Sequence, residues 1–158
     1  MAEAVGKCKA AQKNPVLALP HILRGKDSQK GRQLMENWLA AGADTFLVRS
    51  LEQLGLLKEL SRSAVIRVIT DANLYTWNTR AEQFLLKTTG TQKNLRIIRT
   101  TMPLELTAQE LAQTKNAVLP RELIVYTHLP LMVSEQCVKK TLGKCDGANG
   151  RMTMTGYR

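Results

Sequence analysis

Short apolar runs alternate with amphipathic segments along most of this 158-residue chain. Runs of about 4–8 apolar residues are typical of buried strands, whereas apolar residues that recur every three or four positions are typical of helices. The runs that predict strands are 16–19, 45–48, 65–70, 95–98 and 123–126. A helical pattern follows each of the first four, so the alternation predicts an α/β protein with a parallel sheet covered by helices.

Polar residues before each helical pattern supply the expected N-caps, because their side chains can accept a hydrogen bond from a backbone N–H of the first turn. The caps that we predict are Asp27 or Ser28, Ser50, Asn78 and Thr107. Gln53 and Glu110 stand three residues after two of these caps, which is the spacing of a capping box. The side chains expected to face the sheet include Leu34, Trp38, Leu54, Leu57, Ala81, Phe84 and Leu85. The glycines expected to end two of the helices are Gly42 and Gly90.

Five βα units fit two architectures. They form either a small doubly wound domain or half of a (β/α)8 barrel, which typically needs about 250 residues. The pattern itself leaves both open. Residues 1–14 are polar and rich in Ala and Lys, and we interpret them as a loose leader or as the remnant of a preceding helix.

The chain carries a formal net charge of +10, which favours polyanionic partners and nucleic acid above all. The alternative is that the cations are simply solvated on helix faces, since they are spread along the chain. Aromatic residues make up only 4%, too few for the base-stacking surface of a single-strand binder. The sequence has no apolar run long enough for a membrane helix and no signal-peptide core, and it predicts a cytoplasmic protein.

Polar residues follow every predicted strand, and in parallel βα architectures the chemistry gathers where strands end. The candidates for catalysis are His21, Arg24, Asp71, Glu105 and His128, and those for substrate binding are Arg49, Asn73, Asn78 and Tyr126. Either histidine could move a proton near neutral pH, or the pair could hold a metal together with a carboxylate. The alternative is that these are ordinary polar loop residues. The sequence lacks the motifs of a zinc protease, a serine hydrolase, a P-loop enzyme and a dinucleotide enzyme.

Two cysteines, Cys137 and Cys145, follow the last predicted strand in a segment that contains glycines. A metal or iron–sulfur site needs about four ligands, and Cys8 lies far away in the sequence. The pair could therefore supply two ligands of a larger site, whereas a catalytic thiol and a small buried side chain are the alternatives. The basic residues that would favour the thiolate form are Lys139, Lys140 and Lys144.

The segments Glu-Leu-Ile-Val-Tyr (122–126), Pro-Leu-Met-Val-Ser-Glu-Gln-Cys (130–137) and Cys-Val-Lys-Lys-Thr-Leu-Gly-Lys-Cys (137–145) resemble the peptidase U32 family, the collagenase-like peptidases. Upstream segments resemble barrel segments of the same family, in the same order: 19–24, 71–78 and 103–106. The resemblance covers roughly residues 15 to 158, and the block from 121 to 145 is its most specific part.

The resemblance implies a partial, half TIM-type barrel over residues 15–133, a leader over 1–14 and a truncated cysteine-containing segment over 134–158. It implies peptidase activity by family name, or iron–sulfur-dependent hydroxylation of RNA bases or of a quinone precursor by the full-length protein. Cys137 and Cys145 match the first pair of the cluster cysteines, so this chain alone is expected to lack the cofactor and to need the missing barrel half. The alternative hypothesis is a non-catalytic, basic α/β module that binds RNA or a partner protein.

Overall fold

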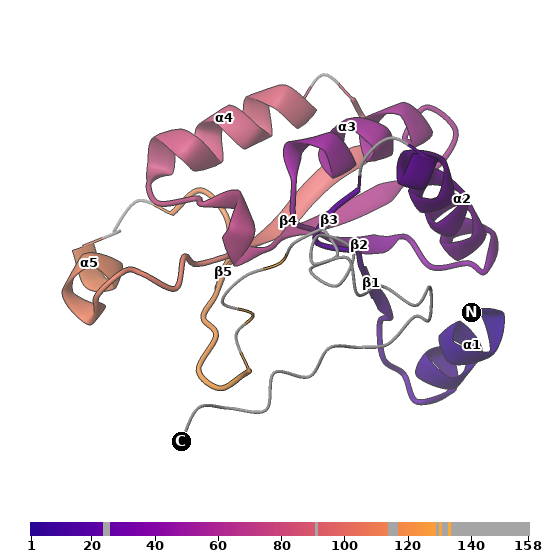
Figure 1. The fold of residues 1–158 in the computed structure, drawn as a ribbon, viewed down its shortest axis with the longest axis horizontal. Coiled ribbons are helices and arrows are strands. Elements are labelled where there is room, and N and C mark those ends of the chain that lie inside the picture. Colours follow the sequence, from indigo (N-terminus) through magenta and orange to yellow (C-terminus); the bar gives the residue numbers. More distant parts are fainter. Residues whose placement is uncertain (24–25, 91, 114–116, 129, 131–132, 134–158) are drawn as a thin grey trace, which may run out of the picture. The chain divides into compact units, whose positions relative to one another are not determined.

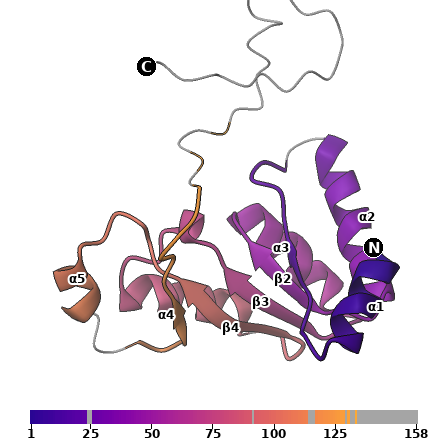
Figure 2. The same cartoon turned by 90° about the horizontal axis from the view of Figure 1, so that it is seen from below.

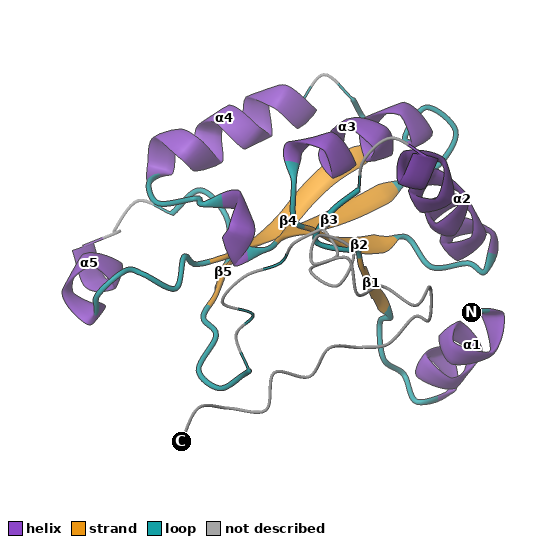
Figure 3. Ribbon diagram, viewed as in Figure 1, coloured by secondary structure: helices purple, strands orange, loops and turns teal. Residues whose placement is uncertain are grey.

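The computed structural model describes residues 1–23, 26–90, 92–113, 117–128, 130 and 133. The chain divides into two units, residues 1–128 and 129–158, and the description below concerns the first. In its described residues five strands form one sheet in the order β1-β2-β3-β4-β5, with every neighbouring pair parallel (Figures 1 and 3). The prediction of an α/β protein with parallel strands that alternate with helices is confirmed.

The strands are β1 (Val16–Ala18), β2 (Thr45–Val48), β3 (Ile66–Thr70), β4 (Leu95–Thr101) and β5 (Arg121–Glu122). The helices are α1 (Ala2–Ala10), α2 (Lys26–Ala40), α3 (Leu51–Leu60), α4 (Thr79–Thr89), α5 (Ala108–Gln113) and the short 3-10 helix η1 (Ala72–Leu74). Residues 1–14, for which a loose leader and the remnant of a preceding helix were the two interpretations, contain α1, and its Val5 is buried in the core. None of the helices in the described ranges has the length and apolar character required to cross a membrane.

The fifth strand is the clearest correction. The sequence predicts a buried strand over 123–126, but β5 ends at Glu122, and Val125 and Tyr126 are 87% and 90% exposed. The last residue pair between the two strands joins Thr101 to Glu122. Because β4 ends at Thr101, the backbone beyond Glu122 has no residues of β4 left to pair with.

Helices α2, α3 and α4 cover one face of the sheet (Figures 1 and 2). The strand residues buried beneath them are Phe46, Val48, Ile66, Val68, Leu95 and Ile97. On the helices, Trp38, Leu54 and Leu57 are buried as predicted, and Leu34 is half-buried. The Trp38 side chain also donates its indole N–H to the backbone oxygen of Thr45 at 3.2 Å, so the core contact includes a hydrogen bond from helix to strand.

Phe84 does not face the sheet, contrary to the prediction, and it is 59% exposed. The buried side chains of α4 are Glu82, Leu85 and Thr89, which lie on one side of the helix at helical spacing. Phe84 is displaced from Leu85 by about 100° around the helix axis. Hydrophobicity alone predicts that Phe84 faces the sheet. The structure instead buries Glu82, because its carboxylate has hydrogen-bond partners in the interior.

The predicted caps are confirmed for three helices and wrong for one. Ser50 and Asn78 accept hydrogen bonds from backbone N–H groups of α3 and α4, and Thr107 and Glu110 form a reciprocal capping box before α5. Helix α2 already begins at Lys26, so Asp27 and Ser28 lie inside its first turn instead of before it. An acidic residue at that place still interacts favourably with the helix dipole. The glycine that ends α2, Gly42, has a φ of 80° as its predicted role requires.

The face of the sheet opposite α2–α4 is more polar. The register pairs Arg67 with Arg96 on this face, and Arg67 forms an ion pair with Asp44 at 2.6 Å. All-parallel sheets are usually apolar on both faces because both are covered. This sheet therefore has one apolar face and one face that carries paired charges.

Over the stretch that pairs with β3, strand β4 contains one more residue than its partner. Val68 pairs with Ile97, but the next residue, Ile69, pairs with Arg99, which leaves Ile98 between them as a β-bulge. The bulge places Arg99 beside Ile69 on the polar face. Strand β4 ends at Thr101, three residues beyond the predicted end.

Candidate functional site

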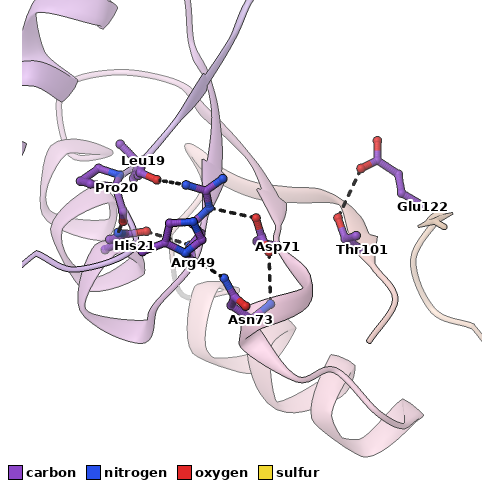
Figure 4. A network of polar contacts seen from close by, with 9 residues as sticks. Leu19, Pro20, His21, Arg49, Asp71, Asn73, Thr101 and Glu122 are labelled. Carbon is purple, nitrogen blue, oxygen red and sulfur yellow. Dashed lines mark hydrogen bonds and ion pairs between the residues drawn. The ribbon is translucent and has the colours of Figure 1, made fainter. Parts of the chain in front are cut away.

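Arg49 lies at the centre of a polar network where β1, β2 and β3 end. It directly follows β2, and its Nε donates to Oδ2 of Asp71 at 3.0 Å, directly after β3. Its Nη1 donates to the backbone oxygen of Leu19, directly after β1, at 2.9 Å (Figure 4). Parallel strands present their carboxyl ends at the same edge, so one side chain can connect three strands.

Asp71 extends the network to a second loop. While Oδ2 accepts from Arg49, Oδ1 accepts the backbone N–H of Asn73 at 3.2 Å and so caps η1. The amide nitrogen of Asn73 lies 3.2 Å from Nδ1 of His21, and Figure 4 shows the two side chains pointing toward each other. An Asn73 amide N–H can donate to Nδ1 when the neutral ring carries its proton on Nε2.

Gln53 fixes the backbone beneath these side chains, and it is fully buried. Its side-chain oxygen accepts the N–H of Arg49 at 2.8 Å, and its nitrogen donates to the backbone oxygen of Pro20 at 2.5 Å. The Ser-x-x-Gln spacing predicts only a capping box for Gln53. Its position in the first turn of the helix that follows β2 is the signal that indicates this second role.

Four predicted site residues thus lie together: His21, Arg49, Asp71 and Asn73. We call them the carboxyl edge. The Arg49 and Asp71 side chains are 21% and 16% exposed, so their opposite charges offset each other in a partly desolvated place. The edge offers N–H donors from an arginine and an amide, and it can hold or move one proton at Nε2 of His21.

The other predicted site residues lie elsewhere or outside the described residues. Asn78 accepts the N–H of Ala81 at 3.0 Å, so its side chain caps α4. The candidates that are exposed are Glu105, Tyr126 and His128. The candidates outside the described residues are Arg24, Cys137 and Cys145.

No group of three or more His, Cys, Asp or Glu side chains in the described ranges is arranged to hold a metal ion. The cysteine that those ranges contain is Cys8 on α1, which is partly buried. The described residues alone therefore do not form an iron–sulfur site, and the expected ligands Cys137 and Cys145 lie outside them.

A second polar cluster joins β4, β5 and α4, and no local sequence pattern predicts it. Glu82, whose side chain is wholly buried, accepts from Arg121 Nε at 2.9 Å and from the N–H of Val118 at 3.2 Å. Glu122 forms an ion pair with Arg99, and its second oxygen accepts from the Thr101 hydroxyl at 3.3 Å. These contacts hold the short strand β5 against the sheet.

Three buried hydroxyl groups connect β3 and β4 to the loop between η1 and α4. The Thr70 hydroxyl donates to Oγ1 of Thr100 at 2.8 Å, and the hydroxyls of Thr100 and Thr76 lie 2.8 Å apart. All three side chains are at most 2% exposed. The segment that begins at Asp71 and contains Asn73 is thereby anchored at Thr76, where it leads into α4.

Comparisons with known proteins assign no family or activity to this arrangement. No family model, no curated protein and no solved structure matches the chain. A functional interpretation therefore depends on the carboxyl edge itself, on the charge of the chain and on the resemblance in its sequence.

Proposed function

We propose that this chain is part of a U32-family (β/α)8 barrel and that its carboxyl edge binds RNA as the substrate. The observation that carries the proposal is the meeting of His21, Arg49, Asp71 and Asn73 from the ends of three neighbouring parallel strands. In (β/α)8 barrels the substrate binds at this edge, because loops after several strands contribute side chains to one place.

The topology supports a barrel over a doubly wound domain. A doubly wound sheet reverses its strand order at a switch point, and ligands bind there. In the described residues the order runs from β1 to β5 without a reversal, and α2, α3 and α4 lie on one face (Figure 2). Sequential order with helices on one side is the arrangement of consecutive βα units in a barrel wall.

Among the expected activities, the edge supports substrate binding better than peptide cleavage. Cleavage requires an activated nucleophile or a metal-bound water. The serine beside Arg49 is Ser50, which caps α3, and the carboxyl edge contains neither a cysteine nor a lysine. A peptidase would need these groups from residues outside the carboxyl edge.

RNA fits the charge of the chain better than a peptide does. A net charge of +10 attracts phosphate backbones and strengthens any contact made at the edge. Arg49 and Asn73 would orient the bound group, and His21 would donate or accept a proton at Nε2. The iron–sulfur chemistry of the hydroxylase alternative would come from outside the described residues, and substrate binding at the edge does not depend on it.

Fluorescence anisotropy with a labelled single-stranded RNA of about 10 nucleotides tests the proposal. His21→Ala and Asn73→Ala should each weaken binding about 3- to 10-fold, because each removes one hydrogen-bonding group. The matched control is His128→Ala, which removes an exposed histidine outside the network and should leave the Kd unchanged. Equal Kd values for wild type and both edge variants would refute the proposal, as would binding of a peptide pool in preference to RNA.

A further inference from the structure

We infer that Tyr75 contacts the substrate by stacking its ring on a base of the bound RNA. The inference rests on the proposed function and names a residue that the carboxyl edge does not include. Tyr75 follows η1, the turn whose first cap is Asp71 and which contains Asn73. Three features of the loop support the inference: its backbone conformation, its buried anchor and its exposed ring.

Tyr75 adopts a left-handed backbone conformation, with φ 50° and ψ 50°. Residues other than glycine rarely adopt this conformation, because their Cβ atom approaches the following carbonyl oxygen. The strain is not offset by burial, since Tyr75 is 56% exposed. A bulky, exposed, strained residue is poorly explained by stability, and such residues cluster at ligand-binding sites.

The neighbouring residue shows how this conformation is held. Thr76 is 2% exposed, and its hydroxyl meets that of Thr100, which also accepts from Thr70. The Tyr75 N–H donates to the backbone oxygen of Ala72 at 3.0 Å, and its own oxygen accepts the N–H of Trp77 at 2.8 Å. The loop is thus fixed on both sides of Tyr75, which leaves the ring presented to solvent.

A nucleic-acid base is the ligand that suits this ring. Stacking needs only a flat face, which every base offers, and the charge of +10 draws the phosphate backbone to the protein. The low aromatic content excludes an extended stacking surface, but a single exposed ring needs only one base. Trp77, two residues further on, is 42% exposed and provides a second aromatic surface in the same loop.

The test compares the RNA oligonucleotide of about 10 nucleotides with an abasic oligonucleotide of the same length, which keeps the phosphates and lacks the rings. Tyr75→Gly should weaken RNA binding about 5- to 100-fold and leave the weaker abasic binding unchanged. Tyr75→Phe keeps the ring and should bind RNA like the wild type. Because glycine relieves the strain, Tyr75→Gly should keep or raise Tm, by at most about 4 °C.

The matched control is Gln12→Gly, because Gln12 is the other non-glycine residue with positive φ in the described part of the chain, at 55°. It should resemble Tyr75→Gly in Tm and the wild type in RNA binding. Unchanged RNA affinity in Tyr75→Gly, or a loss in Tyr75→Phe of the same size, would overturn the inference while leaving the effect of His21→Ala intact. Absence of RNA binding by the wild type would instead refute the proposed function and this inference with it.

Discussion

Strands β1 to β3 and strands β4 and β5 are held in the sheet in different ways. Between β2 and β3 the register runs from Thr45 opposite Arg67 to Val48 opposite Thr70, over buried apolar side chains. Strand β5 has only two residues paired with β4, and side-chain ion pairs hold it on both faces of the sheet. Apolar burial and a continuous ladder thus stabilise the first region, and charge pairs stabilise the second.

The difference shows which part of the sheet depends on single polar contacts. A strand held by a ladder and an apolar layer tolerates changes in single polar contacts, because the contribution of each is small. A strand held by a buried ion pair depends on both partners, since removing one leaves a buried charge without its counterpart. We therefore expect the region of β4 and β5 to open before the region of β1 to β3.

The largest effect should come from the apolar layer of the first region. Trp38→Ala removes a side chain that is 6% exposed, together with its hydrogen bond to Thr45, and should lower the free energy of unfolding by about 3–5 kcal/mol. Phe84→Ala, at an aromatic residue that is 59% exposed, should cost less than about 1 kcal/mol. Chemical denaturation of both variants measures the contrast, and equal losses would mean that the apolar layer is misassigned.

A somewhat smaller effect should come from the ion pair of the second region. Glu82→Ala removes the buried carboxylate that contacts Arg121 and Val118, and should cost about 3 kcal/mol. Glu59→Ala removes one side of an exposed ion pair with Arg32 and should cost no more than about 1 kcal/mol.

Hydrogen exchange shows whether the effect of Glu82→Ala is local. The N–H of Met102, bonded to the backbone oxygen of Glu122, should exchange faster in the variant. The N–H of Asp71, bonded to the backbone oxygen of Val48, should change less. A uniform change at both amides would show that the two regions unfold as one cooperative unit.

The smallest effect concerns α5, which buries none of its side chains and so relies on its cap. Hydrogen bonds from the backbone N–H and then the hydroxyl of Thr107 lower the pKa of Glu110 below its ordinary value. A lowered folded-state pKa means that this contribution to stability is present above the ordinary glutamate pKa and disappears as the pH falls through the lowered value. Thr107→Ala removes the hydroxyl but keeps the backbone N–H, so it should raise the Glu110 pKa only part of the way toward ordinary, as measured by NMR titration of the carboxyl group. An unchanged pKa would show that the Thr107 hydroxyl does not stabilise the carboxylate.

Much of the fold follows from the sequence because local signals and burial agree. The strands near 45–48 and 65–70 are apolar runs that the structure buries, and Ser50 and Asn78 cap helices as their residue types predict. The carboxyl edge was partly predictable for the same reason. Once the strands are parallel, residues such as His21 that follow a strand end must lie at one edge.

The remaining features depend on contacts between distant residues. Nothing local to 123–126 indicates that β4 ends too early to pair with it, and nothing local to Glu82 shows that Arg121 reaches it from 39 positions away. Gln53 acts through Pro20, a partner 33 positions away. Pattern reasoning assigns each residue by its own polarity and spacing, so it misses polar side chains that are buried because a distant partner satisfies them.

The bulge at Ile98 has a consequence for how the length of the chain can change. Because Val68 and Ile69 already pair with Ile97 and Arg99, an in-frame deletion of Ile98 leaves every partner of β4 in place. A deletion of Ile97 has the same outcome, because Ile97 and Ile98 are identical neighbours and either loss gives the same sequence. The bulge is thus a place where β4 can lose one residue while its inward and outward side chains keep their faces.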